Sequence, residues 1–490
     1  MPVRPSKVPA PIGGWNTRDP VSSMSPTDAI VMNNVVVDTD GVAVRPGYVE
    51  YVNHSGDGVQ RLISWETQFG ERLISSDNTG SNHRLFDVST ATASTIATGF
   101  MRSTWDSTVF NGSLGLVNGG DTPRKLDYSP GSGVTISRMV IGGISQPQRL
   151  SVIHAHKERS YFATGDEPAF WYSATEALGG NLARFPIDRV SSTGGNVIGI
   201  STWSRDGGGG PDDFFVLFLN TGEVIVYSGS DPSDANDWSI VGRYSMGRIL
   251  AYTEFFGKIH VVTEEDYNIV PDDLLTQGLK TPTKLSGAAR DAVRKYGGDW
   301  QITIDPASGF RIINIPSRDR EQHILNMRTG SASRWTIGAN CWGRYGGDIF
   351  FGGKDGKVYK LVDNTDDAGT AIEWAIQQGF SDFRSPMEKN IPNYRPVWTV
   401  NGTFSYASGL AFDYNPRDFI QTVTTSSDGP DWDTTDWDTS LWGSGDPQKL
   451  DWLVGNGRGQ SVSLVQNGSS TRRAVFHHTD YRIEESNDTL

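Results

Sequence analysis

The sequence predicts an all-β protein: a β-propeller of about six or seven blades, with an additional C-terminal β region and one or two short helices. Aromatic residues make up 11% of the 490 residues, including 15 Trp, which is too many for a disordered chain. The 56 Gly and 24 Pro recur between short apolar runs, as turn residues recur between strands. The third observation is a strand–turn–strand pattern that repeats along most of the chain.

Seven segments carry this pattern, in which two apolar runs flank a polar turn of Gly, Asp, Asn or Pro, as in a β-hairpin. The clearest turns are at residues 220–222 and 354–356. Equivalent positions recur about every 45 residues, close to the length of a four-stranded propeller blade. The segments are 71–89, 112–129, 158–174, 214–229, 257–273, 310–330 and 347–364.

A closed ring is the expected arrangement because one hairpin cannot bury its apolar face alone. The run 42–52 precedes the first hairpin and is predicted to pair with the last blade. The chain then divides into an N-terminal arm, short helix and closing strand (1–58), the blades (59–365) and a C-terminal β domain or docked strands (366–490). A series of unrelated β-domains with similar turns is the alternative.

Two short helices are expected. Residues 25–34 begin with Ser25 as N-cap and Pro26 at the first helical position, and Asp28 follows three residues after the cap. Residues 285–298 end in Gly297 and Gly298, which favour a helix terminus.

The composition restricts the classes of partner and compartment. The net charge is −14, so a broad basic surface for nucleic acid is not expected. Cys341 is the only cysteine, which excludes an internal disulfide and suggests a small buried apolar side chain. The first residues lack the apolar core of a signal peptide, and no run is long enough to span a bilayer.

Catalytic and metal-binding patterns are weak. Sialidases share the propeller fold, but segments 75–80 and 426–432 only approximate their turn motif and do not recur in each blade. His154 and His156 fall on one face of a predicted strand, where ordinary strand histidines are more common than metal ligands. No catalytic residue, cofactor or metal is therefore predicted.

Three tryptophans near the C-terminus are the candidate interaction residues. Trp432, Trp437 and Trp442 are five residues apart, a spacing that matches neither a helix nor a strand. They are predicted to be loop side chains that anchor the chain to a neighbouring surface.

The segment 13–48 resembles the opening of tail proteins from short-tailed bacteriophages, namely the packaged-DNA stabilisation or tail hub (nozzle) family. The segment 431–443, rich in Trp and Asp, also resembles the C-terminal part of such proteins. The residues that carry the N-terminal resemblance are Gly13, Gly14, Asn16, Pro26, Asp28, Ala29, Asn33, Asn34, Gly41, Arg45, Pro46 and Gly47.

The resemblance implies a non-enzymatic virion subunit, assembled in the host bacterial cytoplasm. Such a subunit would form a ring, typically a hexamer, below the adaptor protein, retain packaged double-stranded DNA and conduct it on infection. Tail fibres or spikes would dock on the ring. An acidic chain suits a DNA conduit because it repels the phosphate backbone.

Two other functions remain open at this point. One is a glycan-binding or glycan-cleaving, sialidase-like propeller of a receptor-binding tail protein. Converging arginines or a carboxylate pair in the central depression would favour it. The other is a propeller scaffold of a cellular bacterium without a role in a virion.

Overall fold

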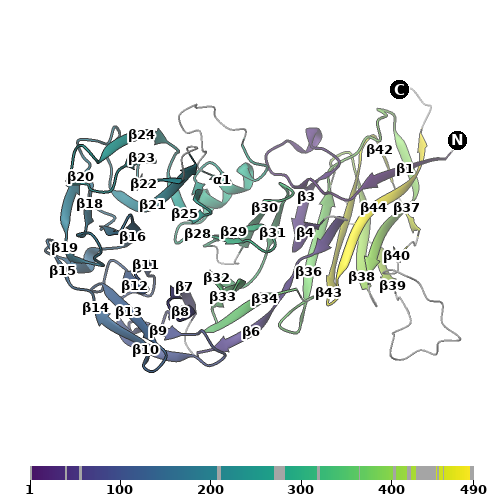
Figure 1. The fold of residues 1–490 in the computed structure, drawn as a ribbon. Helices are drawn as coiled ribbons and strands as arrows, with labels where there is room; N and C mark the ends of the chain where they lie inside the picture. The colour runs from purple at the N-terminus through teal and green to yellow at the C-terminus, as the bar shows by residue number, and fades with distance from the viewer. Residues whose placement is uncertain are drawn as a thin grey trace.

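The computed structural model describes residues 3–38, 41–54, 58–206, 211–269, 282–316, 321–363, 365–400, 404–415, 421–425, 448–449, 452–455 and 457–485. Figure 1 shows a ring of small antiparallel sheets with a β-sandwich beside it. Among the described residues there is one α-helix, α1 (Ser286–Lys295), and there are two 3-10 helices, η1 (Val21–Ser23) and η2 (Pro147–Arg149). The predicted all-β propeller is confirmed, and it has seven blades.

The first four blades each contain four strands, and the first strand of each blade lies innermost in the ring (Figure 1). A short parallel pair, β15 (Ile141–Gly142) and β19 (Gly180–Asn181), lies between the second and third blades. The blade strands are β7 (Val59–Thr67), β8 (Gly70–Asp77), β9 (His83–Asp87) and β10 (Ser94–Phe100); β11 (Asp106–Phe110), β12 (Ser113–Val117), β13 (Arg124–Ser129) and β14 (Gly133–Arg138); β16 (Val152–His156), β17 (Arg159–Ala163), β18 (Ala169–Tyr172) and β20 (Ala183–Pro186); and β21 (Val197–Asp206), β22 (Pro211–Leu219), β23 (Glu223–Ser228) and β24 (Ser239–Ser245).

The last three blades complete the ring. Three strands of the fifth blade are described, and the seventh takes its outermost strand from the N-terminal part of the chain. Their strands are β25 (Ile249–Phe255), β26 (Lys258–Thr263) and β27 (Tyr267–Ile269); β28 (Gln301–Asp305), β29 (Phe310–Ile315), β30 (Glu321–Asn326) and β31 (Ala332–Trp335); and β32 (Ala339–Tyr345), β33 (Asp348–Gly353), β34 (Lys357–Val362) and β6 (Gly47–Asn53).

The seven predicted hairpins are the second and third strands of the seven blades. Two of their turns use glycines at positive φ, Gly222 at +86° and Gly356 at +75°, a region that side chains with a Cβ rarely adopt. The run 42–52, predicted to close the ring, does so only in its second half: β6 pairs antiparallel with β34 from Gly47↔Val362 to Asn53↔Lys357. Residues 42–44 belong instead to another strand, β5 (Gly41–Val44), outside the blade.

Apolar packing between blades stabilises the ring. Seven separate apolar clusters of buried residues lie between neighbouring blades, and one of them joins the seventh blade to the first. In that closing cluster Val52 of β6 and Phe350 of β33 pack with Val59 and Leu73 of the first blade. Burial of such side chains contributes about 1.5–3 kcal/mol each. Cys341 is buried there too, as a small apolar side chain, and burial raises its pKa to about 12.

The β-sandwich is made from both ends of the chain, so the N-terminal arm is part of it. A buried core that includes Trp374, Trp398 and Phe476 lies between its two sheets. One sheet contains β4 (Val35–Asp38), β5 (Gly41–Val44), β44 (Ala474–Glu485) and β37 (Lys389–Val400), with β1 (Arg4–Pro9) on β44 and β40 (Gln448–Lys449), β41 (Leu453–Val454) and β42 (Arg458–Gly459) on β37. The other contains β2 (Gly14–Trp15), β3 (Asp28–Asn33), β36 (Thr370–Gln378), β43 (Val462–Ser470), β38 (Phe404–Phe412) and β39 (Gln421–Thr425).

One of the two predicted helices is wrong. Residues 25–34 hold a strand, β3, which pairs with β36, because its β-branched residues are used in a sheet whose inner face is buried. Ser25 does not cap a helix: its hydroxyl contacts Thr27, and its carbonyl accepts from the Asp28 N–H in a turn. The helix predicted at 285–298 is confirmed as α1, which packs against the fifth and sixth blades.

No helix among the described residues is both long and apolar enough to cross a membrane.

Candidate functional site: the junction between propeller and sandwich

The chain passes between the sandwich and the propeller at two neighbouring points, which one ion pair joins. Arg45 and Pro46 connect β5 of the sandwich to β6 of the seventh blade, and the chain returns to the sandwich after β34 through β35 (Asp366–Asp367). Arg45 is only 2% exposed and binds Asp367 in a bidentate manner, with Nη1–Oδ1 at 2.8 Å and Nη2–Oδ2 at 2.6 Å. We call this the crossover pair; its forked geometry is specific to arginine.

Asn34 extends the crossover pair into the sixth blade. Its Oδ1 accepts from Arg45 Nε at 3.0 Å and from the Thr336 N–H at 2.9 Å, and its Nδ2 donates to the Glu373 carbonyl of β36 at 2.7 Å. The residue has a φ of +52°, a left-handed conformation that Asn tolerates better than most residues. The Asn34 side chain thus bonds both the propeller and the sandwich. It also gives the buried Arg45 guanidinium a further hydrogen-bond partner, so that no unpaired charge is buried.

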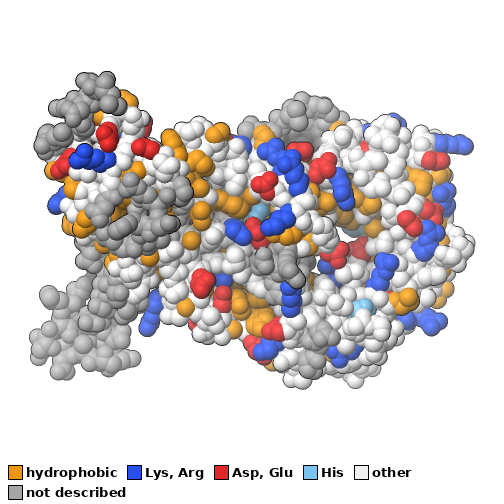
Figure 2. Space-filling model, turned by 180° about the vertical axis from the view of Figure 1, so that it is seen from behind, with side chains coloured by type: hydrophobic (Ala, Val, Ile, Leu, Met, Phe, Trp, Pro, Cys, Tyr) orange, Lys and Arg blue, Asp and Glu red, His pale blue; other side chains and the backbone are white. Residues whose placement is uncertain are grey.

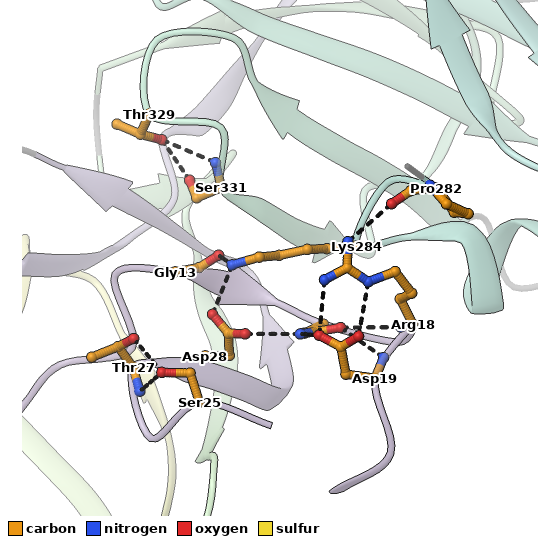
Figure 3. Close-up of polar contacts among 11 residues, drawn as sticks. Gly13, Arg18, Asp19, Ser25, Thr27, Asp28, Pro282, Lys284, Thr329 and Ser331 are labelled. Carbon is orange, nitrogen blue, oxygen red and sulfur yellow. Dashed lines mark hydrogen bonds and ion pairs between the residues drawn. The ribbon is translucent and has the colours of Figure 1, made fainter. Parts of the chain in front are cut away.

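A second group of polar residues, which we call the N-terminal network, joins residues 13–28 to the loop before α1 (Figure 3). Lys284 lies at its centre: Nζ donates to the Gly13 carbonyl at 2.9 Å and to Asp28 Oδ1 at 2.7 Å. Asn16 is 2% exposed and donates to both Asp19 Oδ2 and Asp28 Oδ2 at 2.8 Å. Bonds from Arg18 and from Asn16 lower the pKa of Asp19 to about 2, so it stays ionised at neutral pH.

The same segment packs directly on the propeller. The Thr17 hydroxyl accepts from the Ala288 N–H in the first turn of α1 at 3.0 Å. Trp15 contacts His323 of β30 edge-on, with ring centres 5.1 Å apart, and donates from Nε1 to the Ile30 carbonyl. Gly14 approaches β31 so closely that a Cβ would lie 2.4 Å from the Ala332 nitrogen, and its φ is +79°. Only glycine fits there without displacement of the backbone.

The predicted N-terminal site residues therefore fall into two places. Gly13, Asn16 and Asp28 meet in the N-terminal network, with Gly14 beside it. Arg45, Pro46 and Gly47 lie at the crossover, where the Pro46 carbonyl accepts from Arg45 Nη1 at 2.9 Å and Gly47 begins β6. The predicted interaction residues Trp432, Trp437 and Trp442 lie outside the described residues.

The partners of Asp28 and Arg45 were not predicted from the sequence. Lys284 and Asp367 are 256 and 322 positions from Asp28 and Arg45, and no local pattern links them. A signal existed for Arg45 alone, since an arginine is unusual in the valine-rich run 42–52, which was predicted to be a strand of the ring.

A cleft of about 650 Å³ lies beside the crossover pair, between the β4–β5 hairpin and loops of the sixth and seventh blades. Its wall is apolar at Val36, Val44 and Phe310, and Arg328 and Arg473 lie among its charged residues. Arg328 is held by the Ala307 carbonyl at 2.5 Å, and Arg473 pairs with Asp38 at 2.8 Å. Both arginines therefore already have partners.

Side chains of non-neighbouring blades meet at the centre of the propeller. Arg61 of the first blade pairs with Asp299, next to β28 of the sixth blade, at 3.6 Å, although the seventh blade lies between them in the ring. Polar side chains of some inner strands also accept bonds from a neighbouring blade, as Asp106 Oδ2 does from the Ile153 N–H at 2.8 Å. A DNA double helix, whose major groove alone is about 12 Å wide, does not fit through such a space.

Burial is the main cause of the pKa shifts of three titratable side chains on the inner strands of the propeller. Burial raises the pKa of Asp106 to about 6 and lowers the pKa of His154 to about 4 and that of His156 to about 3. Both histidines contact the Thr202 hydroxyl at 2.9 Å, and His156 packs against Phe215. They are therefore neutral side chains with structural contacts. Within the described residues, no three His, Cys, Asp or Glu side chains gather as metal ligands would.

Comparison with known proteins identifies no family. No family model and no curated protein matches the chain. Its structure is similar to YCF48 from Cyanidioschyzon merolae (TM-score 0.42, 13% identity, 64% of this chain and 98% of that one) and to BBS1N in complex with ARL6DN (TM-score 0.40, 10% identity, 65% and 98%). It is also similar to the dihydro-heme d1 dehydrogenase NirN, with a TM-score of 0.36 and 11% identity, over 56% of this chain and 57% of that one. These similarities are too low to indicate a function.

Proposed function

We propose that this chain is a structural subunit of a short-tailed phage tail, a hub or nozzle protein that forms a homo-oligomeric ring, typically a hexamer. In this proposal the ring lies below the adaptor in the virion, retains packaged DNA and conducts it during ejection. It also offers docking surfaces to tail fibres or spikes. The subunit has no enzymatic role, and it assembles in the host cytoplasm.

The contacts made by residues of the segment 13–48, which carries the resemblance, support this proposal most. Asp28 and Arg45 are buried in contacts that join the propeller to the sandwich, and the buried Asn16 holds Asp28 in place. Buried, fully bonded polar groups at a joint favour a structural role, because a catalytic group needs access to substrate. A ring subunit that withstands the pressure of packaged DNA requires two domains that do not move apart.

The charge and the propeller centre limit where DNA could pass. On the face shown in Figure 2, acidic and basic side chains are interspersed and do not form one basic surface. With a net charge of −14 the subunit repels phosphates, and the ion pair across the propeller centre blocks a duplex. The proposed conduit is therefore the space enclosed by several subunits, and the propellers form its wall.

Electron microscopy of the purified full-length protein, with mass spectrometry of purified virions, tests the proposal. The expected result is a closed ring and the presence of the chain in tails. A monomer at all concentrations that is absent from particles would contradict it. Hydrolysis of host polysaccharide by the purified protein would instead support the alternative of a glycan-cleaving propeller.

A further inference from the structure

We infer that the outer face of the sandwich carries a binding site for an acidic saccharide, centred on Trp452, Arg395 and Arg482. The inference does not rest on the proposed function. These residues lie on the sheet of β44, β37 and β41, away from the junction and on a different domain from the propeller centre.

The sheet register places the three side chains on one face. Tyr394 of β37 pairs with Leu453 of β41, and both are buried. Because successive side chains in a strand alternate, the neighbouring Arg395 and Trp452 project outward. Arg482 lies on the adjacent strand β44, where it pairs with Asn393, two residues from Arg395.

The two arginines hold the indole in place. The guanidinium carbon of Arg482 lies 4.4 Å from the centre of the Trp452 ring, and that of Arg395 lies 4.7 Å from it. Arg395 is itself fixed by Asp480, with Nη2–Oδ2 at 2.6 Å and Nε–Oδ2 at 3.1 Å. Trp452 is nevertheless 37% exposed. An exposed aromatic ring with a fixed orientation loses little entropy when a ligand packs on it.

The surrounding charge favours an anion. Two neighbouring cross-strand rows lie on this face: Lys7, Asp480 and Arg395, and next to them Pro5, Arg482 and Asn393. These two rows carry three cations and one carboxylate, and that carboxylate already pairs with Arg395. The next row holds a second carboxylate, Glu484, which accepts from Asn390 Nδ2 at 2.8 Å. Within the part of the chain that the structure describes, no carboxylate lies within ion-pair distance of Arg482 or Lys7. A local positive charge thus remains on a strongly acidic chain.

A saccharide suits the combination of an exposed indole and a local positive charge better than a protein or a nucleic acid does. The core of a protein interface is depleted of charge, whereas the described part of this face is rich in charge and has few large exposed apolar groups besides Trp452 and the 52% exposed Val454. Single-stranded nucleic acids need a basic groove and several stacking rings, whereas the chain has a net charge of −14 and Trp452 is one ring on the described part of this face. A sugar ring has one apolar face to pack on an indole, and its carboxylate or sulfate can bind a guanidinium.

Isothermal titration of the full-length protein with sialyllactose, an oligogalacturonate and a chondroitin sulfate fragment tests the inference, with lactose as the neutral reference. We expect at least one acidic probe to bind more tightly than lactose and to weaken as salt is raised. Trp452→Ala should weaken that binding about tenfold or more, and Arg482→Gln should reduce it to the level of the neutral reference.

Phe256→Ala is the matched control, because Phe256 is an 85% exposed aromatic residue on the propeller, and it should leave binding unchanged. Trp452→Phe should retain part of the affinity, and circular dichroism should show that every variant is folded. No binding of any acidic probe, or equal binding by the Trp452→Ala variant, would overturn the inference. So would Trp452-dependent binding of a single-stranded oligonucleotide with no saccharide binding.

Discussion

The propeller and its junction with the sandwich are stabilised in different ways. The propeller closes through a backbone ladder between β6 and β34 and through an apolar cluster between each pair of neighbouring blades. The junction has only short backbone pairings, such as β35 with β6 and β3 with β31. It depends more on polar side chains, above all the buried Arg45 and Asn34 and the partly buried Lys284. Apolar burial is spread over many residues and tolerates single changes, whereas a buried ion pair fails when one partner is removed.

The largest expected effect is at the crossover pair. Arg45→Met leaves Asp367 and Asn34 without their buried partner and should lower the free energy of unfolding by about 3–5 kcal/mol. Urea unfolding followed by circular dichroism measures this. Arg4→Met is the control, since Arg4 pairs with Glu485 at 3.5 Å on the surface and should cost less than about 1 kcal/mol. Equal effects of the two variants would show that the crossover pair has no special role.

Two glycines with nearly the same φ allow the junction and the propeller to be compared directly. Gly14 at the junction has a φ of +79°, and Gly112 in a propeller turn has a φ of +78°, but an added Cβ has nothing within 4 Å at Gly112. Gly112→Ala should therefore cost about 1 kcal/mol from strain alone. Gly14→Ala should cost about 2 kcal/mol more, because its Cβ overlaps β31. Thermal or urea unfolding of both variants gives the difference, and a difference near zero would contradict the close approach.

Local patterns in the sequence predict much of the fold, but they do not predict the contacts of the junction. The seven hairpins, the closing strand and α1 follow from local patterns of apolar runs and turn residues, so they were predictable. The helix expected at 25–34 fails because pairing with β36 overrides its capping residues. The partners of Asp28 and Arg45 lie more than 250 positions further along the chain, and a single sequence holds no physical signal for such a pairing.

Within the N-terminal network, Asn16→Ala should cost about 2 kcal/mol, because it removes two donated bonds and leaves buried Asp28 less satisfied. Asn236→Ala is the matched control: this exposed amide contacts only Asp234 at 3.1 Å, and the change should stay within about 0.5 kcal/mol. Urea unfolding at neutral pH measures both. If the Asn16 variant were as stable as the control variant, the N-terminal network would not stabilise the fold.

The smallest expected effect is a pH dependence in the propeller centre. Burial raises the pKa of Asp106 to about 6, so the folded state holds a proton that the unfolded state has released above its ordinary pKa of about 3.9. Stability should thus fall as pH rises from about 4 to 6, by about 1–2 kcal/mol. The Asp106→Asn variant should lack this slope relative to the wild type in unfolding measured across that range. Parallel pH profiles would show that Asp106 titrates normally.

We expect the contacts of the crossover pair and of the N-terminal network to make the propeller and the sandwich one cooperative unit. Differential scanning calorimetry of the full-length protein and of a double variant, Asn16→Ala with Arg45→Met, tests it most directly. The wild type should unfold in a single transition, and the double variant should show two, as the sandwich separates from the propeller. Two transitions in the wild type, or one unchanged transition in the double variant, would contradict the claim.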